Sequence, residues 1–353
     1  MSSISQRKTD HLDLTIQANV GFRQTTTLFE CVRLVHDALP DLDFETLDTS
    51  VEILGKRLNA PILIAGMTGG NDRAGTINRQ LAEIAQAHGY ALGLGSQRAM
   101  VARPETLASY RVREVAPSVL LLGNLGIVQA REMSDAQITD LVAAVGADAL
   151  CVHMNPAMEL VQDNGDRDFR GGLERFAALV ESLPIPVVAK ETGCGISADV
   201  AIRLRRVGVR HIDVSGAGGT SWVGVEALRA SAGRRGLGES FWDWGVPTAA
   251  SVVFAEAAGY ETIFATGGLR DGLDVARALA LGASAGGIAR QVLKALDAGG
   301  PTEAAAYLQR VQAEIRTAML LTGSPNVAAL RRAPRVVVGE LRDWISQVGP
   351  GVR

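Results

Sequence analysis

The chain has 353 residues, of which 47% are hydrophobic and 21% are charged, and its formal net charge is −3. The small charge gives no electrostatic footprint for nucleic acid, and the apolar runs are too short to span a membrane. The polar start MSSISQRKTDHLDL and the isolated cysteines Cys31, Cys151 and Cys194 predict a cytoplasmic protein with reduced thiols.

Short apolar runs recur along the chain, and each is followed by turn residues and then by a segment with helical periodicity. This alternation predicts parallel strands, and eight of them predict a closed (β/α)₈ barrel of the α/β class. The predicted strands are Pro61–Met67, Ala91–Ser96, Val119–Asn124, Ala149–His153, Pro186–Lys190, His211–Ser215, Thr262–Thr266 and Ala283–Ala289.

The rest of the chain is predicted to decorate this barrel within a single domain covering residues 1–353. Residues 1–60 form an N-terminal extension, residues 61–299 the barrel, and residues 300–353 a tail with a helix from about Thr302 to Leu321. Asp271 can cap the helix before the last strand, and Gly282 can end it. The long segment Ser231–Trp244 is predicted to be a loop, acting as a lid or as a subunit contact.

The polar residues at the strand ends should converge on one mouth of the barrel. The loops after the seventh and eighth strands commonly bind a phosphate through backbone N–H groups, and both loops here carry small residues. The phosphate candidates are Gly267, Gly268, Ala289 and Arg290. The alternative is that the glycines only form tight turns.

Lys190 ends a strongly apolar strand, where burial of its charge requires an anionic or accepting partner. A flavin is one such partner, because a lysine beside its N1–C2=O edge stabilises negative charge on the reduced ring. An ion pair with Glu191 is the alternative. Short polar side chains that suit the rim of a flat heterocycle are Thr68, Ser96, Asn124, Ser215 and Thr220.

The segment His153–Arg167 is unusually polar for the exit of a strand and places His153, Asn155 and Glu159 near the mouth. Glu159 could hold Mg²⁺ against an anionic substrate, because hard cations take oxygen ligands. The alternatives are a solvated carboxylate at a helix start for Glu159 and hydrogen-bonded packing for His153.

Several segments in combination resemble the type 2 isopentenyl-diphosphate isomerases across nearly the whole chain. They are RKTDH at Arg7–His11, MTGG at Met67–Gly70, GSQR at Gly95–Arg98, GNLG at Gly123–Gly126, the HxN segment at His153, KETGCGIS at Lys190–Ser197, SGAGGTSW at Ser215–Trp222 and GGLRDGLDVA at Gly267–Ala276.

This resemblance implies an enzyme that interconverts isopentenyl and dimethylallyl diphosphates with FMN, Mg²⁺ on the diphosphate, and NADPH as the flavin reductant. The reaction has no net redox change, and the reduced flavin moves protons. Implied FMN ligands are Gly66, Met67, Thr68, Ser96, Asn124, Lys190, Ser215, Thr220, Gly267, Gly268, Ala289 and Arg290. Implied diphosphate ligands are Arg7, Lys8, His11, Arg98, His153 and Asn155, with Arg7 and Lys8 on a folding lid. Glu159 would hold the metal and Trp222 would form a wall over the substrate.

One position departs from the family pattern HxNxxQE, because Met158 stands where the glutamine is expected. A thioether cannot replace an amide in proton transfer. The hypotheses are an isomerase that tolerates Met158, a slow isomerase, an FMN enzyme for another allylic or acyl substrate, and a flavin-binding homologue without catalysis. An FMN hydroxy-acid oxidoreductase is also considered, although no histidine precedes the glycine pair after Ser215. A homo-oligomer is expected.

Overall fold

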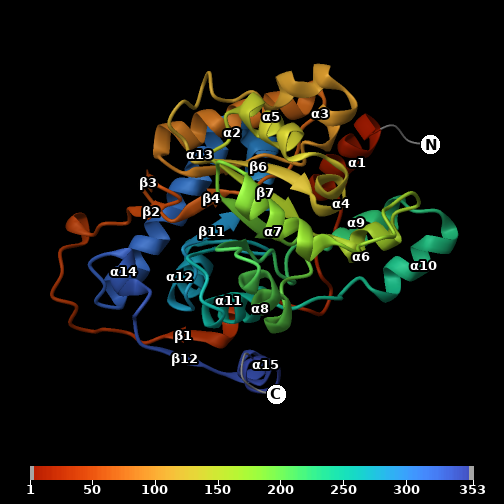
Figure 1. Cartoon of the computed structure of the whole chain (residues 1–353). Coiled ribbons are helices and arrows are strands. Elements are labelled where there is room, and N and C mark those ends of the chain that lie inside the picture. Colours follow the sequence, from red (N-terminus) through yellow and green to blue (C-terminus); the bar gives the residue numbers. More distant parts are fainter. Residues whose placement is uncertain (1–3, 350–353) are drawn as a thin grey trace.

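The chain folds around a closed barrel of eight parallel strands (Figure 1), with the strand order β10-β11-β4-β5-β6-β7-β8-β9. The computed structural model describes the backbone of residues 4–349 and the side chains of residues 9–349. The barrel strands are β4 Ile62–Ile64, β5 Ala91–Gly93, β6 Leu121–Gly126, β7 Ala149–His153, β8 Val187–Lys190, β9 His211–Asp213, β10 Thr262–Ala265 and β11 Ala285–Ile288. Each lies within or overlaps one predicted strand, so the predicted fold class is confirmed.

Helices surround the barrel, because at least one helix follows each barrel strand before the next barrel strand begins. They are α2 Asp72–His88, α3 Arg98–Ala102, α4 Ile127–Glu132, α5 Asp135–Val145, α6 Pro156–Val161, α7 Gly172–Ser182, α8 Ala198–Arg206, α9 Trp222–Arg229, α10 Ala232–Ser240, α11 Thr248–Ala257, α12 Gly272–Ala280 and α13 Arg290–Leu321. As predicted, Asp271 caps α12 by accepting the N–H of Asp274, and Gly282 follows its end with a φ of +114°. Among residues 4–349, no helix is long and apolar enough to cross a lipid bilayer.

Alternation along the strands divides the core into two layers. Ile62 and Ile64 face the helices, whereas Leu63 between them points into the barrel with Phe264 and a set of small or branched residues. A hairpin of β2 Val51–Ile53 and β3 Lys56–Leu58 closes the amino-terminal end of the barrel. The opposite end, where the strand carboxyl ends meet, therefore remains for a site.

The two ends of the chain are joined on one side of the barrel. Strand β1 Val32–Leu34, from the N-terminal extension, pairs antiparallel with β12 Arg335–Val337 from the tail, as seen at the bottom of Figure 1. Helices α14 Val327–Leu330 and α15 Gly339–Val348 flank β12. The predicted tail helix is the second part of α13, which kinks at Gly299 and Gly300 before Pro301. Short 3₁₀ helices cover Phe29–Cys31, Phe44–Thr46 and Pro104–Tyr110.

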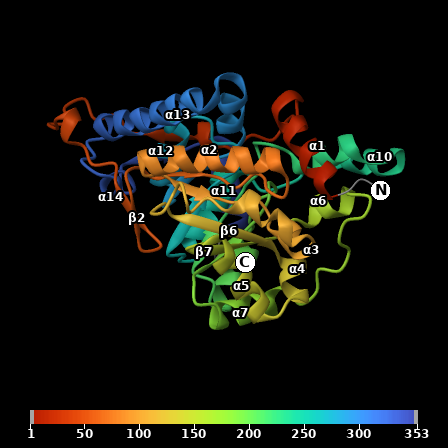
Figure 2. The same ribbon diagram turned by 90° about the horizontal axis from the view of Figure 1, so that it is seen from above.

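Helix α1 Ile4–Gln17 packs against α9 and α13. Figure 2 shows it beside one end of α13. Leu12 and Thr15 on this helix are buried, and Leu12 belongs to the main hydrophobic core. The backbone of the predicted lid residues Arg7 and Lys8 lies in α1, but their side chains lie outside the described ones.

The inner layer of the barrel generates a stability prediction. Phe264 has no exposed surface and fills the barrel interior, so Phe264→Ala should lower the free energy of unfolding by about 3–5 kcal/mol. Val336 on β12 is half-exposed, and Val336→Ala should change it by less than about 1 kcal/mol. Urea unfolding of the two variants measures the difference, and equal losses would contradict this account of the core.

Candidate active site

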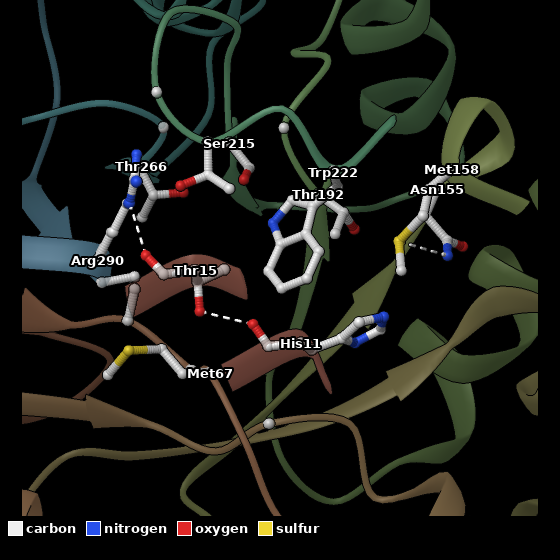
Figure 3. A pocket seen from close by; sticks show the side chains of 18 of the residues that line it. His11, Thr15, Met67, Asn155, Met158, Thr192, Ser215, Trp222, Thr266 and Arg290 are labelled. Atoms are coloured by element: carbon white, nitrogen blue, oxygen red, sulfur yellow. Dashed lines mark hydrogen bonds between the residues drawn. The ribbon is translucent and has the colours of Figure 1, made fainter. Parts of the chain in front are cut away.

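A cavity of about 510 Å³ opens at the carboxyl ends of the barrel strands. All the predicted site residues whose side chains are described line it, and Figure 3 shows several of them pointing inward. They are His11, Gly66, Met67, Thr68, Ser96, Arg98, Asn124, His153, Asn155, Met158, Glu159, Lys190, Ser215, Thr220, Trp222, Gly267, Gly268, Ala289 and Arg290. The structure thus brings them together, while their individual roles remain predictions.

One end of the cavity is built from backbone. Gly267 and Gly268 have φ values of +100° and +88°, which favour glycine. A Cβ atom at Gly267 would lie 2.2 Å from the carbonyl oxygen of Gly216, so this loop packs directly on the neighbouring one. Helix α13 begins beside them at Arg290, without a side-chain cap from the described residues. The N–H groups of its first turn have no intrahelical partner, and Ala289, Arg290 and Gln291 line the cavity, so these groups can donate hydrogen bonds to an anion bound there.

The Arg290 side chain is directed away from this backbone cradle and toward helix α1. Its Nε atom donates to the carbonyl oxygen of Thr15 at 2.8 Å, and its Nη2 atom donates to that of Ala18 at 2.7 Å. Cations stabilise the carboxyl end of a helix, where carbonyl groups lack intrahelical partners. The guanidinium group therefore holds the end of α1, and Figure 3 shows its bond to Thr15.

Lys190 forms an ion pair with Asp213 on the adjacent strand, with Nζ 2.8 Å from Oδ2. The alternative partner considered from sequence, Glu191, is wrong. Its Oε2 atom instead accepts the backbone N–H groups of Thr192, Gly193 and Cys194 at 2.5–2.6 Å. Burial raises the pKa of Glu191 to about 7, although these three hydrogen bonds act in the opposite direction. Glu191 therefore shapes the loop after β8.

His153 is held in one orientation by Asn124, whose Oδ1 atom lies 2.8 Å from Nδ1 of the imidazole. The amide nitrogen of Asn124 donates to the carbonyl oxygen of Leu94 at 3.1 Å, so Oδ1 is the atom that accepts. Neutral His153 then carries its proton on Nδ1 and a lone pair on Nε2. Burial, with the charges of Lys190 and Arg98, lowers the pKa of His153 to about 4.

The predicted metal carboxylate, Glu159, is buried and already accepts two hydrogen bonds. The Asn155 amide donates to Oε1 at 2.8 Å, and the backbone N–H of Asp166 donates to Oε2 at 2.8 Å. Residues 4–349 contain no cluster of three or more His, Cys, Asp or Glu side chains that could hold a metal. One carboxylate suits Mg²⁺ only if water and substrate oxygens supply the remaining ligands.

Met158 lines the same part of the cavity, on the opposite side of Trp222 from Arg290 in Figure 3. Its sulfur atom lies 3.8 Å from the Asn155 amide nitrogen. An uncharged thioether here is a weak acceptor and has no proton to give. The position therefore contributes apolar surface to the cavity.

Helix α1 is tied to α9 by charged side chains. His11 Nε2 lies 2.7 Å from Oε1 of Glu226, and Oε2 of Glu226 accepts from Arg229 at 2.8 Å. Arg229 also reaches Asp10 at 3.2 Å, while the His11 ring meets Trp222 edge-on with centroids 5.3 Å apart. Sequence reasoning missed Glu226, because a carboxylate within an amphipathic helix gives no signal of its burial.

The segment predicted to be a loop at Ser231–Trp244 is largely helical, because residues 232–240 form α10. Beyond the helix, Trp242 donates its indole N–H to the carbonyl oxygen of Gly21 at 2.9 Å. Asp243 accepts the backbone N–H groups of residues 23–25 at 2.7–3.2 Å. The segment thus holds the chain that follows α1.

The fold and this cavity define a barrel of the FMN-dependent dehydrogenase class, and the profile of that family matches residues 1–168 and 171–336. Among solved structures, a putative lactate oxidase from Pediococcus acidilactici gives a TM-score of 0.68 at 17% identity and covers 96% of each chain. Mandelate oxidase with (S)-2-phenylpropionate gives a TM-score of 0.64 at 22% identity, covering 96% of this chain and 99% of that chain. These likenesses show the fold alone.

More similar relatives identify the branch. Isopentenyl-diphosphate delta-isomerase of Thermococcus onnurineus is 45% identical over 350 residues, covering 97% of this chain and 93% of that protein. The enzyme of the same name from Methanothermobacter thermautotrophicus is 44% identical over 347 residues, covering 98% and 97%. The chain therefore belongs to the isopentenyl-diphosphate delta-isomerase family, which confirms the resemblance in its motifs.

The lowered pKa of His153 generates a pH prediction. The unfolded chain binds this proton near the ordinary value of 6.5, whereas the folded chain binds it only near 4. His153 therefore contributes less to the free energy of unfolding as the pH falls through that window. The raised pKa of Glu191 contributes in the opposite sense over the same range, so the test is the difference between variant and wild type. We expect His153→Asn to gain stability relative to wild type between about pH 7 and about pH 5, as measured by urea unfolding.

His36 provides the matched control, because its side chain is exposed. His36→Asn should differ from wild type by the same amount at both pH values. A difference between His153→Asn and wild type that does not change with pH would show that folding does not lower the pKa of His153.

Proposed function

We propose that this chain is an FMN- and Mg²⁺-dependent isomerase that interconverts isopentenyl diphosphate and dimethylallyl diphosphate. The main support is one cavity that contains a backbone cradle at one end and a separate set of His153, Asn155 and Glu159 at the other. The named relatives act in the same class of reaction. NADPH as the flavin reductant, a cytoplasmic location and a homo-oligomeric state are further parts of this proposal, carried over from the resemblance.

The residues present fit FMN. Thr68 Oγ1 is buried in the cavity lining and has no hydrogen-bond partner among the described residues, as expected of an atom that serves a ligand. Gly66 and Gly95 allow the strand ends to approach closely, since a Cβ atom at either would lie within 2.5 Å of neighbouring backbone. Gly267, Gly268 and the first turn of α13 would hold the phosphate.

When bound in its reduced form, the flavin supplies acid–base chemistry to the substrate without net redox change. The protein residues around it would bind, orient and exclude water. Lys190 would lie at the polar edge of the ring, while Trp222 and the docked helix α1 close the cavity. A dry cavity strengthens each electrostatic contact inside it.

The diphosphate would bind at the opposite end, near Arg98, His153 and Asn155. His11 also lines the cavity, and Arg7 and Lys8 on the same helix remain predicted ligands. An anion beside His153 would favour its protonated form, which can donate from both ring nitrogens. Glu159 would supply the protein oxygen to Mg²⁺, with substrate oxygens and water completing the coordination.

The proposal assigns no proton transfer to Met158. Its side chain lies beside Asn155 where the family pattern has an amide, so it would pack against the hydrocarbon part of a prenyl substrate. The 45% identical relative, named isopentenyl-diphosphate delta-isomerase, supports an isomerase, and of the hypotheses for Met158 we favour a slow isomerase that lacks the amide. A hydroxy-acid oxidoreductase is less well supported, because the Ser215–Thr220 loop after β9 contains no histidine to act as a base.

The direct test supplies the proposed substrate to reduced enzyme. Purified protein with FMN, Mg²⁺ and a chemical reductant should convert isopentenyl diphosphate in deuterated water to deuterium-labelled dimethylallyl diphosphate. Glu159→Gln keeps a hydrogen-bond acceptor but loses the charge, so its turnover should fall most at low Mg²⁺. No product and no label from wild type would remove the isomerase proposal, and anaerobic bleaching of the oxidised flavin by a hydroxy acid would favour the oxidoreductase.

Met158 can be tested by restoring the amide of the family pattern. We expect Met158→Gln to raise kcat by about tenfold or more, since a positioned proton-transfer group contributes roughly 10²–10⁴-fold. FMN content should not change. Met158→Leu is the matched control, because it keeps an apolar side chain of similar volume and should leave kcat within about twofold. Equal kcat values in wild type and Met158→Gln would exclude a chemical role at this position.

A further inference from the structure

A buried carboxylate behind the cavity binds three groups of residues that line the cavity, namely an ammonium group, a hydroxyl group and a backbone N–H. Asp213 ends β9, is 2% exposed, and is paired in register with Lys190 on β8. Its Oδ2 atom accepts from Lys190 Nζ at 2.8 Å. Its Oδ1 atom accepts from the Thr266 hydroxyl and from the backbone N–H of Ser215, the latter at 3.3 Å.

Each of the three donors faces the cavity, whereas Asp213 itself does not line it. Lys190 comes from β8, Ser215 follows β9 and Thr266 follows β10, so one carboxylate connects three neighbouring strand ends. Among the described side chains, Asp213 is the carboxylate that pairs with Lys190, whereas Glu191 accepts three backbone N–H groups. The position of the Lys190 ammonium group therefore depends on Asp213.

Ser215 shows that Asp213 also shapes the backbone. Its φ is +36°, an unfavourable value for a residue with a Cβ atom, and its N–H bond to Asp213 supports this turn. The next residue, Gly216, packs so closely on Thr248 that a Cβ atom would lie 2.3 Å from its Cα. Loss of the carboxylate would remove a hydrogen-bond acceptor from Lys190 and from Thr266, and would also remove the support of the strained turn at Ser215.

We propose that Asp213 is a positioning residue for the cofactor, acting through Lys190. It directs the ammonium group toward the polar edge of the flavin and offsets its charge, so the bound ring meets an ion pair instead of an isolated cation. This inference rests on the FMN-binding part of the proposed function and does not depend on which substrate the enzyme takes. An isolated cation would favour the reduced, more electron-rich flavin, whereas the pair moderates that preference.

The test is the reduction potential of bound FMN. Asp213→Asn keeps the shape and an acceptor for Thr266 and Ser215 but leaves the charge of Lys190 unopposed. Affinity for reduced over oxidised FMN should rise by about tenfold or more, which corresponds to a potential more positive by about 30 mV per tenfold for two electrons. Asp199→Asn is the matched control, since Asp199 is an exposed carboxylate on α8 that pairs with Arg203, and it should cause no shift.

A double variant separates the charge effect from structural damage. Lys190→Met combined with Asp213→Asn removes both charges and leaves no unpaired one, so it should fold and hold FMN. Lys190→Met alone should make the potential more negative, and adding Asp213→Asn should return it only partly toward wild type, by a smaller shift than Asp213→Asn causes when Lys190 is present. This comparison holds even if Asp213→Asn alone fails to fold.

An effect of Asp213→Asn that is the same with and without Lys190, or no effect in either background, would overturn the proposal. The proposal would also be overturned if the reduction potential of the double variant did not lie closer to the wild-type value than that of Lys190→Met. Wild-type protein that binds no FMN would instead contradict the proposed function, and absorbance of the bound flavin distinguishes the two failures.

Discussion

The buried ion pair between Lys190 and Asp213 is the interaction on which the cavity depends. A lysine at the end of an apolar strand is expensive to desolvate, and a carboxylate on the adjacent strand compensates for that cost. The parallel register of β8 and β9 places the two residues side by side, with Nζ and Oδ2 2.8 Å apart. The same carboxylate accepts from Ser215 and Thr266, so the charge pair also orders the neighbouring strand ends.

Helix α1 completes the cavity because it is held at two places. Arg290 binds the carbonyl groups of Thr15 and Ala18 at its carboxyl end, and the His11–Glu226 contact joins the middle of the helix to α9. Arg290 also begins α13, whose first turn faces the cavity. Arg290 therefore lies between the proposed phosphate cradle and the helix that covers the substrate end. It links the site proposed for the cofactor phosphate to the helix that closes the cavity.

Much of this architecture could be predicted from sequence, because it follows from local patterns. Runs of Val, Ile and Leu indicated all eight strands, and the polar residues after them converge because parallel strands share a carboxyl edge. Residues whose roles depend on long-range pairing gave no such signal. Asp213 lies in a short strand, and its burial is explained by Lys190 on the neighbouring strand. Glu226 lies within a helix, and its burial is explained by His11 on α1 and by Arg229 one turn further along α9.

Other differences have similar physical causes. The glycines and arginines of Ser231–Trp244 resemble a loop, yet tertiary packing against α6 and α9 makes α10 helical. The strands β1 and β12 are three residues each and come from opposite ends of the chain, so neither is recognisable alone. Arg290 was predicted from its position to bind phosphate. In the structure its guanidinium group points toward α1, and the local sequence gives no signal of that direction.

The most direct measurement of the central claim is a crystal structure of the protein grown with FMN, Mg²⁺ and inorganic diphosphate. The account predicts the flavin phosphate at the first turn of α13 beside Gly267 and Gly268, with the polar edge of the ring at Lys190. It places the magnesium diphosphate next to His153 and Glu159 in the same cavity. Flavin bound elsewhere, or diphosphate bound away from Glu159, would contradict it.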